Sequence, residues 1–375
     1  MINFNKAARC LQETARLVAR GYRREIRKSA GKTMNQQEAI IQLNKWENNE
    51  LLFKDYGRVQ SGDFPLDAFL KKWENEPVSL EYAINPKTMA TYLQETSYIP
   101  DMYDITIVKS PRYLPLFWHR HEFYEIVYVL CGKSNIIFDR TALELTSGDF
   151  LMIAPNYSHQ IGVFDDDSIV LNIIIRSSTL LDIFLNAIRD KTLISRFLLS
   201  HTYGGKMFSY LLFHARNDFT IRNYILDIYI ELDKPDDYSN RIATSLVTIL
   251  FTQLVRHYSS TAEMPNMHRS DNVYASQVMN YILDHYADCT LESLAHHLHF
   301  SAQYCSKIIK SSTGLSFSEL LTNIRIQKAK NLLLSTPMKI NDISDHLGYS
   351  NPETFIRVFK KSTGTTPSAY RKSYS

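Results

Sequence analysis

The chain has 375 residues, of which 45% are hydrophobic, so it is long enough for two or three globular domains. Its four cysteines lack the spacing of a metal site, which favours free thiols in a cytoplasmic protein. No run of about 18 apolar residues exists, which excludes a membrane span, and the N-terminus lacks the apolar core of a signal peptide. The net charge of +3 conceals an uneven distribution of charge. Residues 302–375 carry 11 Lys and Arg against 4 Asp and Glu, and residues 1–32 carry 9 against 2, so each end has a net charge of +7. The middle, residues 33–301, therefore has a net charge of −11.

Two helical regions are predicted before the first strand. Residues 1–32 place apolar side chains on one stripe of a basic amphipathic helix: Ala8, Leu11, Ala15, Val18, Tyr22 and Ile26. Such a helix could bind a membrane surface, nucleic acid or an acidic partner; we favour an extension without a defined role, or translation from Met34. Residues 35–101 predict several short helices with Trp46 and Trp73 as core anchors, packed on the domain that follows.

Short β-rich runs follow, at 102–109, 125–130, 134–140, 141–145, 150–154 and 168–176. Many short strands at regular spacing predict a small β-barrel or jelly roll. His119, His121, Glu125 and Gly132 have the spacing of the first cupin motif, and His159 stands where the second motif has its histidine. This resemblance is partial, because other residues replace motif positions: Tyr113, Asn156 and Val163. Three imidazoles and a carboxylate could ligate a divalent transition ion, which raises the hypothesis of a metal-dependent enzyme.

Helical patterns return at 178–188, 191–199, 217–232 and 237–258, with one further strand at 207–214. The last of these helices carries an apolar stripe: Ile242, Leu246, Ile249, Leu250, Leu254 and Val255. The stripe could pack on the barrel or against a second copy of the chain. Residues 259–271 are polar, contain Pro265 and predict an interdomain linker.

One helical pattern occurs twice between residues 291 and 371. Leu294 pairs with Ile343 at an offset of 49, and Lys307 pairs with Arg357 at an offset of 50. Each copy predicts a helix-turn-helix unit. The predicted N-caps are Ser301 and either Ser350 or Asn351, the predicted helix ends are Gly314 and Gly364, and the predicted core residues are Tyr304, Ile308, Ile309, Phe355, Val358 and Phe359.

A longer helix is predicted between the two units, from about residue 317 to 334. At 1.5 Å per residue it would be about 26 Å long. That length suits two recognition helices in successive major grooves, which lie about 34 Å apart on one face of B-DNA.

Residues 281–371 resemble the AraC/XylS transcription regulators. The matching positions are Arg325, Ile326, Ala329, Leu332, Leu333, Thr336, Ile340, Ile343, Gly348, Tyr349, Phe355, Arg357, Val358, Phe359, Lys360, Gly364, Pro367, Tyr370 and Arg371. Four residues depart from the family pattern: Cys305, Ile309, Ser344 and Thr354. Both units contact DNA in that family, so the resemblance implies base-reading by Gln303, Ser306, Lys307, Glu353, Ile356 and Arg357.

Side-chain chemistry distinguishes these candidates. Arg357 can donate two hydrogen bonds to guanine, Gln303 can bond to adenine, and Glu353 can accept from cytosine. The other basic residues on the two helices suit phosphate contacts: Lys310, Lys360 and Lys361.

The resemblance also bears on the barrel, since AraC-type sensor domains resemble cupins and often keep this His and Glu pattern without a metal. We therefore favour a barrel that binds a small effector, a carbohydrate or related metabolite, with no catalytic residue, metal or other cofactor. The alternative is a metal-dependent cupin enzyme tethered to a DNA-binding domain. The expected effector contacts are Trp118, His119, His121, Tyr124, Glu125, Tyr157 and His159.

The predicted fold is multidomain, a cupin-like β-barrel plus helices followed by an all-α tandem helix-turn-helix domain. The expected divisions are a helical N-terminal extension at 1–100, the effector-sensing barrel at 101–180, a helical dimerisation region at 181–265 and the DNA-binding domain at 270–375. The expected partners are operator half-sites on double-stranded DNA, the effector, a second copy of the chain and, for an activator, RNA polymerase; no membrane partner is expected.

Overall fold

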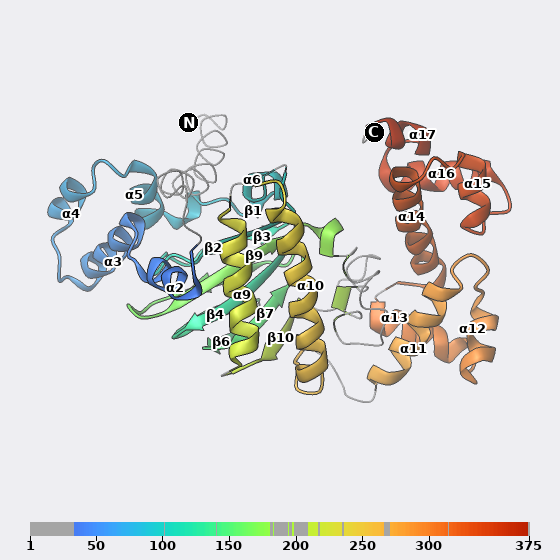
Figure 1. Ribbon diagram of the computed structural model, residues 1–375, viewed down its shortest axis with the longest axis horizontal. Coiled ribbons are helices and arrows are strands. Elements are labelled where there is room, and N and C mark those ends of the chain that lie inside the picture. Colours follow the sequence, from blue (N-terminus) through green and yellow to red (C-terminus); the bar gives the residue numbers. More distant parts are fainter. Residues whose placement is uncertain are drawn as a thin grey trace. The chain divides into compact units, whose positions relative to one another are not determined.

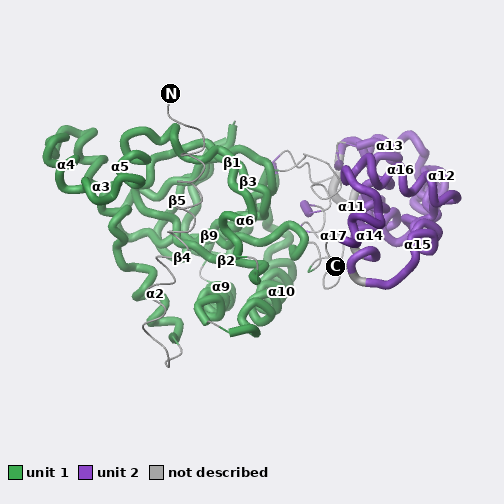
Figure 2. The backbone as a smooth tube through the Cα atoms, turned by 90° about the horizontal axis from the view of Figure 1, so that it is seen from above, with its two compact units in different colours: residues 1–189, 209–264 green, residues 190–208, 265–375 purple. Residues whose placement is uncertain are grey.

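The computed structural model describes residues 34–373 except 101, 140, 181–182, 184–193, 195–196, 199–208, 217, 235, 266–270 and 314. The chain divides into two compact units, residues 1–189 with 209–264 and residues 190–208 with 265–375 (Figure 2). The amphipathic helix predicted at 1–32, and most of the helices predicted at 178–188 and 191–199, lie outside the described residues. Among the described helices, none has the length and apolar character needed to cross a membrane.

Two antiparallel sheets form the centre of the first unit (Figure 1). The larger sheet contains, in spatial order, β10 (Tyr210–His214), β7 (Asp149–Ile153), β4 (Tyr124–Cys131), β9 (Ile169–Ile175) and β2 (Ile105–Lys109). The smaller contains β6 (Thr141–Thr146), β5 (Lys133–Phe138) and β8 (His159–Gly162). The β-rich fold class is confirmed, as are the six predicted runs of strand, whereas β8 was not predicted.

The strands of the larger sheet are buried on both faces, as β7 illustrates. Successive residues of a strand face opposite sides. Leu151 and Ile153 join the apolar core between the two sheets, which also contains Val127 of β4. Phe150 faces the other way, and its ring lies 6.0 Å from that of Phe251. This double burial explains why the strand is an unbroken apolar run in the sequence.

Helices α9 (Phe219–Leu232) and α10 (Ser239–Tyr258), which the sequence predicted as helices, lie side by side over the larger sheet (Figure 1). The buried face of α10 contains Leu250 and Leu254 from the predicted stripe. Ile242 and Ile249, from the same stripe, are 44% and 42% exposed. The stripe therefore divides, with one part packed inside the unit and another facing outward.

The predicted linker at 259–271 is shorter than expected. Glu263 pairs with Leu212 of β10 through two 2.8 Å backbone hydrogen bonds, and Met264 is buried. The start of this segment thus belongs to the first unit. Polar composition misled the prediction because a backbone pairing needs no apolar side chains.

Residues 36–98 form helices around a small core of their own. The helices are α2 (Gln36–Asn44), α3 (Asn48–Ser61), α4 (Leu66–Lys72), α5 (Pro77–Ile84), the short 3-10 helix η1 (Pro86–Thr88) and α6 (Glu95–Tyr98). Trp73 joins this core together with Leu52, Phe53, Phe69 and Ala83. Trp46, the second predicted anchor, lies outside it and stacks on Tyr113 instead, with a ring separation of 6.2 Å.

A buried ion pair joins these helices to the barrel. Glu50, on α3, accepts hydrogen bonds from the Arg112 guanidinium at 3.0 and 3.1 Å and from Lys109 Nζ at 2.9 Å. Glu50 is fully buried and Arg112 is 1% exposed. Burial raises the pKa of Glu50, but the hydrogen bonds from Arg112 and Lys109 outweigh it and hold that pKa below its usual value. The predicted packing of this segment on the barrel is confirmed.

Between residues 271 and 373, the described part of the second unit contains seven helices. They are α11 (Asp271–Asp284), α12 (Leu291–Leu298), α13 (Ala302–Thr313), α14 (Phe317–Ser335), α15 (Ile340–His346), α16 (Pro352–Thr363) and α17 (Pro367–Ser373). The predicted joining helix is α14. Its first half contributes Leu320 and Ile324 to one core, and its second half contributes Ala329 and Leu333 to the other. A single helix thus connects two separately packed halves.

One predicted core residue is wrong. Tyr304 of α13 is 41% exposed, and Cys305 is fully buried in its place. The repeat itself explains this, because at an offset of 50 Cys305 corresponds to the buried Phe355, and Tyr304 corresponds to Thr354.

Gly348, in the turn of the second helix-turn-helix unit, occupies a position where only glycine fits. Its φ is +77°, and a Cβ there would lie 1.7 Å from the carbonyl oxygen of Ala287. Gly364 has a similar φ of +80° with open space around it.

We expect Gly348→Ala to reduce the free energy of unfolding by about 1–3 kcal/mol more than Gly364→Ala, since overpacking is added to the same backbone strain. Urea denaturation followed by circular dichroism measures both; equal losses would contradict the steric argument.

Candidate functional site

The second helix of each helix-turn-helix unit, α13 or α16, is the predicted recognition helix, and each begins at a side-chain cap. Ser301 Oγ accepts a hydrogen bond from Tyr304 N at 3.1 Å, and Asn351 Oδ1 accepts one from Glu353 N at 2.8 Å. Of the two cap candidates in the second unit, Asn351 makes the bond. The predicted helix end at Gly364 is confirmed by its left-handed φ, whereas Gly314 lies outside the described residues.

The predicted DNA-contacting side chains lie on one face of each recognition helix, because positions three and four apart share a face. On α13 these are Gln303, Ser306, Lys307 and Lys310, and on α16 they are Glu353, Ile356, Arg357, Lys360 and Lys361. All are exposed except Ser306 and Ile356, which are half-buried. Ile356 also packs against the second core. Within the described part of the chain, Arg357 forms no ion pair, which leaves its guanidinium available to a ligand.

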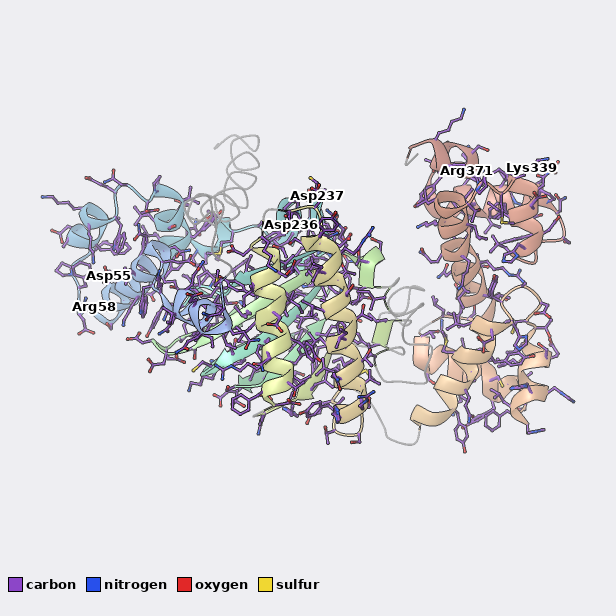
Figure 3. All side chains as sticks on the ribbon, in the orientation of Figure 1. Asp55, Arg58, Asp236, Asp237, Lys339 and Arg371 are labelled. Carbon is purple, nitrogen blue, oxygen red and sulfur yellow. The ribbon has the colours of Figure 1, made fainter. Side chains whose placement is uncertain are left out.

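Two other arginines of this basic unit bind carbonyl groups of the protein. Arg325 Nε donates to the carbonyl of Tyr286 at 2.8 Å, and its Nη2 donates to that of Ala287 at 2.9 Å. Arg371, labelled in Figure 3, donates to Leu333 at 3.0 Å and to Met338 at 2.7 Å. These two charges therefore hold helix ends and loops together, and a count of basic residues overstates the charge free for DNA.

The barrel brings four of the predicted effector contacts to one point. His119 and His159 pair through backbone hydrogen bonds of 3.1 and 2.9 Å, so their rings lie 4.3 Å apart. His121, on the short strand β3 (Arg120–His121), and Glu125, on β4, complete the group. Glu125 Oε2 lies 3.2 Å from His121 Nε2 and 3.1 Å from His159 Nε2. All four residues are at most 5% exposed. We call these four residues the histidine cluster.

Aromatic rings surround the histidine cluster. Phe117 stacks on His119 at 4.7 Å and Phe123 stacks on His121 at 4.6 Å. Burial lowers the pKa of His119 to about 3, so its imidazole is neutral near pH 7. Burial raises the pKa of Glu125, but the neighbouring imidazoles of His121 and His159 outweigh it and lower that pKa below its usual value. The cluster thus presents a carboxylate inside a largely apolar shell.

The other three predicted effector contacts lie elsewhere. Trp118 is 44% exposed beside His119, and Tyr157 is half-buried. Tyr124 precedes Glu125 on β4, so its side chain points to the opposite face of the sheet and does not join the cluster. Phe117 and Phe123 are not among the predicted effector contacts, although each stands two residues from a cluster histidine.

The segment before the barrel also takes part in this site. Strand β1 (Tyr92–Leu93) pairs in parallel with β3, which carries His121. Arg120 N donates to the carbonyl of Thr91 at 3.0 Å. Tyr98, from α6, packs on Phe123 with a ring separation of 5.6 Å. Residues of the helical segment therefore support the strand that positions His121.

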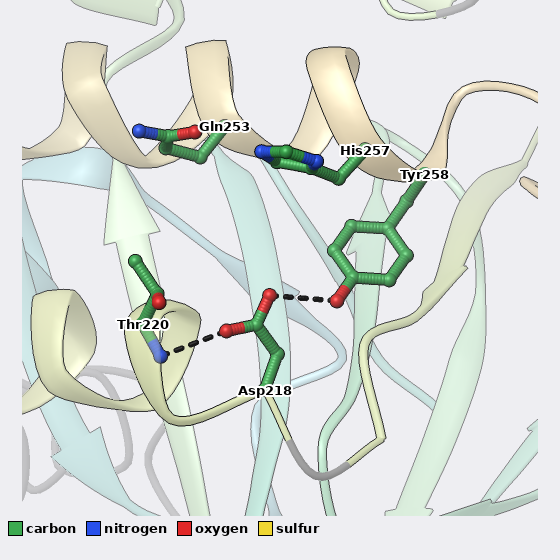
Figure 4. Close-up of a pocket in the computed structure, with 5 residues that line it drawn as sticks. All are labelled: Asp218, Thr220, Gln253, His257 and Tyr258. Carbon is green, nitrogen blue, oxygen red and sulfur yellow. Dashed lines mark hydrogen bonds between the residues drawn. The ribbon is translucent and has the colours of Figure 1, made fainter.

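A surface pocket lies apart from the histidine cluster, at the start of α9 and the end of α10 (Figure 4). It is lined by Asp218, Thr220, Gln253, His257 and Tyr258. Asp218 accepts hydrogen bonds from Thr220 N at 2.8 Å and from Tyr258 Oη at 2.7 Å. Burial and this carboxylate raise the pKa of Tyr258 to about 12. These contacts fasten two helix ends, which is a structural role.

Comparison with known proteins gives matches in both units. A family model described as a helix-turn-helix domain matches residues 294–373, and one described as an AraC-like ligand binding domain matches residues 113–207. The HTH-type transcriptional regulator YtdP of Bacillus subtilis is 42% identical over 86 residues, which is 23% of this chain and 11% of that protein.

Two further relatives are named for regulation. The raffinose operon transcriptional regulatory protein RafR of Pediococcus pentosaceus is 30% identical over 149 residues, 39% of this chain and 53% of that protein. The HTH-type transcriptional activator RhaS of Escherichia coli O157:H7 is 22% identical over 68% of this chain and 87% of its own length. The matches to YtdP and RafR each span less than two thirds of those proteins. One chain thus contains a region that matches an AraC-like ligand binding domain and a region that matches a helix-turn-helix domain, and its relatives include named transcription regulators.

Proposed function

We propose that the protein is a cytoplasmic, sequence-specific DNA-binding regulator whose activity is set by a small effector bound in the barrel. The observation that carries this proposal is the pair of capped recognition helices, each with exposed polar and basic side chains on one face. Base edges in the major groove are read by side chains of this kind, and phosphates by the flanking lysines. Effector binding would favour one arrangement of the chain over another and so change DNA affinity.

The proposed base-reading residues are Gln303, Ser306, Lys307, Glu353, Ile356 and Arg357, and the proposed phosphate contacts are Lys310, Lys360 and Lys361. The test is selection of bound fragments from a randomised DNA library with the full chain, followed by fluorescence anisotropy at two salt concentrations. We expect a recurrent motif with two half-sites, bound at least a thousandfold more tightly than unrelated DNA. Recovery of no common motif would contradict the proposal.

The effector is proposed to bind near Trp118, Tyr157 and the histidine cluster, and to be a carbohydrate or related metabolite. Aromatic side chains suit the apolar faces of sugars, and one relative is named for the raffinose operon. A thermal-shift screen of sugars, sugar phosphates and other metabolites tests this. A ligand at 100 times its Kd adds about 2.7 kcal/mol, which raises the melting temperature by several degrees. Trp118→Ala should abolish that shift, whereas Trp46→Phe, outside the barrel, should retain it.

We propose that the chain has no catalytic activity and that it acts as a homodimer, with RNA polymerase as a further partner if it activates transcription. The outward part of the α10 stripe supports the dimer, since Ile242 and Ile249 stand two turns apart and are both exposed.

We expect the double variant Ile242→Asp with Ile249→Asp to be a monomer in analytical ultracentrifugation where the wild type is a dimer, because charged side chains oppose burial of this face. Gln60→Asp, at an exposed position of α3 in the same unit, is the control for an added charge. A monomeric wild-type protein at micromolar concentration would contradict the proposal.

A further inference from the structure

The segment that leads from α10 to the second unit is fastened to the larger sheet before it leaves the first unit. Helix α10 ends at Tyr258, and Glu263 then pairs with Leu212 of β10. Glu263 N donates to the carbonyl of Leu212, and Leu212 N donates to the carbonyl of Glu263, each at 2.8 Å. Met264 follows and is 7% exposed. We call Glu263 and Met264 the linker anchor.

The linker anchor is seated on the core of the barrel. β10 is an edge strand of the larger sheet, so one side of its backbone is open to a further strand. Glu263 satisfies the N–H and the carbonyl of Leu212 at this edge. Leu212 packs in the core between the two sheets, and the ring of Tyr210 stacks on that of Phe138 with centroids 4.9 Å apart. The strand that holds the anchor is therefore itself fixed.

Side chains add a weaker link to the anchor. His214 Nε2 lies 3.4 Å from Glu263 Oε1, and His214 Nδ1 lies 2.8 Å from Oδ1 of the fully buried Asp149 on β7. The side chain of Glu263 is 60% exposed, so solvent screens its contact with His214. The backbone pairing and the burial of Met264 are therefore the main contacts of the anchor.

The anchor determines how much chain connects the two units. From Met264 to Asp271, where α11 begins, the seven residue steps span at most about 25 Å at 3.6 Å per residue. Without the anchor, the connecting chain begins at Tyr258, whose hydroxyl donates to Asp218 at 2.7 Å. The thirteen steps from Tyr258 to Asp271 span at most about 47 Å. Release of the anchor therefore almost doubles the reach of each DNA-binding unit.

We propose that the linker anchor limits the spacing of the operator half-sites that one dimer can occupy. This inference rests on the proposed function, because it concerns how two DNA-binding units reach two half-sites. A connecting chain that is too short prevents the second contact, and one that is longer than needed lowers the effective concentration of the second unit. With the anchor in place, the dimer selects a narrow range of spacings, and after release it accepts a wider range.

The first experiment detects the anchor without DNA. Hydrogen exchange of the full chain, resolved to single residues, should show slow exchange of the Leu212 and Glu263 amides, because both are hydrogen-bonded. The double variant Glu263→Pro with Met264→Ser removes one donor and the apolar contact, so the Leu212 amide should exchange at least about tenfold faster. Unchanged exchange at Val127, in the centre of the sheet, would show that the barrel remains folded. Glu263→Gln with Met264→Leu, which keeps both backbone bonds and an apolar side chain, is the matched control.

The second experiment measures affinity for the selected operator with ten base pairs added between its half-sites. This insertion keeps both half-sites on one face of the DNA and separates them by about 34 Å more. We expect the wild type to lose at least about thirtyfold in affinity and the released double variant at most about threefold. Insertion of six Gly and Ser residues after Pro265 lengthens the connecting chain as much as release does. That insertion variant keeps the anchor intact and should reproduce the tolerance of the released variant, so the test does not depend on how well the double variant folds.

Two results would overturn the proposal. One is fast exchange of the Leu212 amide in the wild type, and the other is the same loss of affinity in the wild type, the double variant and the insertion variant. Selection of no common DNA motif would contradict the proposed function, whereas a selected motif with this unchanged dependence on spacing would contradict the role of the anchor alone.

Discussion

Replacing Arg357 with alanine is expected to weaken binding to the selected operator by about 5- to 150-fold, the equivalent of about 1–3 kcal/mol for a bidentate contact to guanine. The physical reason is the exposed guanidinium on α16, which has no ion-pair partner in the described residues. The loss should be confined to operators that carry the contacted guanine. Fluorescence anisotropy with operators altered one base pair at a time measures it.

Lys361→Ala is the control for this prediction. A phosphate contact carries no sequence information, so its loss should weaken operator and unrelated DNA equally and reduce the salt dependence by about one charge. If Arg357→Ala behaved in this same way, Arg357 would be a phosphate contact and its proposed role in base-reading would be wrong.

Replacing Arg112 with alanine is expected to reduce the free energy of unfolding of the first unit by about 3–5 kcal/mol. The change leaves the fully buried Glu50 carboxylate with fewer partners and also removes the donor that reaches the carbonyl of Asp166 at 2.7 Å. Urea denaturation followed by tryptophan fluorescence measures this unit selectively, because all three tryptophans lie in it: Trp46, Trp73 and Trp118.

The effect of Arg112→Ala should depend on pH. The pKa of Glu50 is lower in the folded protein than in the unfolded chain, so the ion pair stabilises at neutral pH and its contribution is lost as pH falls through the folded pKa. The difference in the free energy of unfolding between wild type and Arg112→Ala should therefore become smaller in acid.

Lys54→Ala is the control, because it removes an ion pair with Asp166 that joins the same two regions. Both side chains of this pair are more than a third exposed, so a loss of free energy of unfolding below about 1 kcal/mol is expected. Equal losses from both variants would show that burial of the Glu50 pair is unimportant.

Periodicity in the sequence predicted the elements whose signals are local. Both helix-turn-helix units, the helix that joins them and most strands were found, because apolar spacing and caps depend on neighbouring residues. The repeat even contained the correction for Tyr304, since Cys305 rather than Tyr304 matches Phe355. The residues of the histidine cluster were also predicted from spacing, although the backbone pairing that brings His119 and His159 together was not.

What the sequence did not reveal depends on contacts between distant residues. Strand β8 and the pairing of β1 with β3 involve short segments with few apolar side chains, so no periodic signal marks them. Arg325 and Arg371 counted toward the basic charge of residues 302–375, yet their guanidinium groups bind carbonyl groups that lie 38 or 39 residues away in the sequence. Tyr124 was grouped with Glu125 because adjacency in sequence hides the alternation of faces on a strand.

The pairing of β1 with β3 has a practical consequence for dividing the protein into fragments. The matching ligand-binding family begins at residue 113, and a barrel trimmed to that boundary would omit Tyr92–Leu93, Glu50 and Arg112 itself. A fragment starting at 101 would retain Arg112 but leave its guanidinium without the Glu50 carboxylate, and the His121 strand would lose a neighbour. Isolated sensor fragments intended for ligand screening or crystallisation should therefore begin no later than Met34, so that the helical segment and the barrel remain one folding unit.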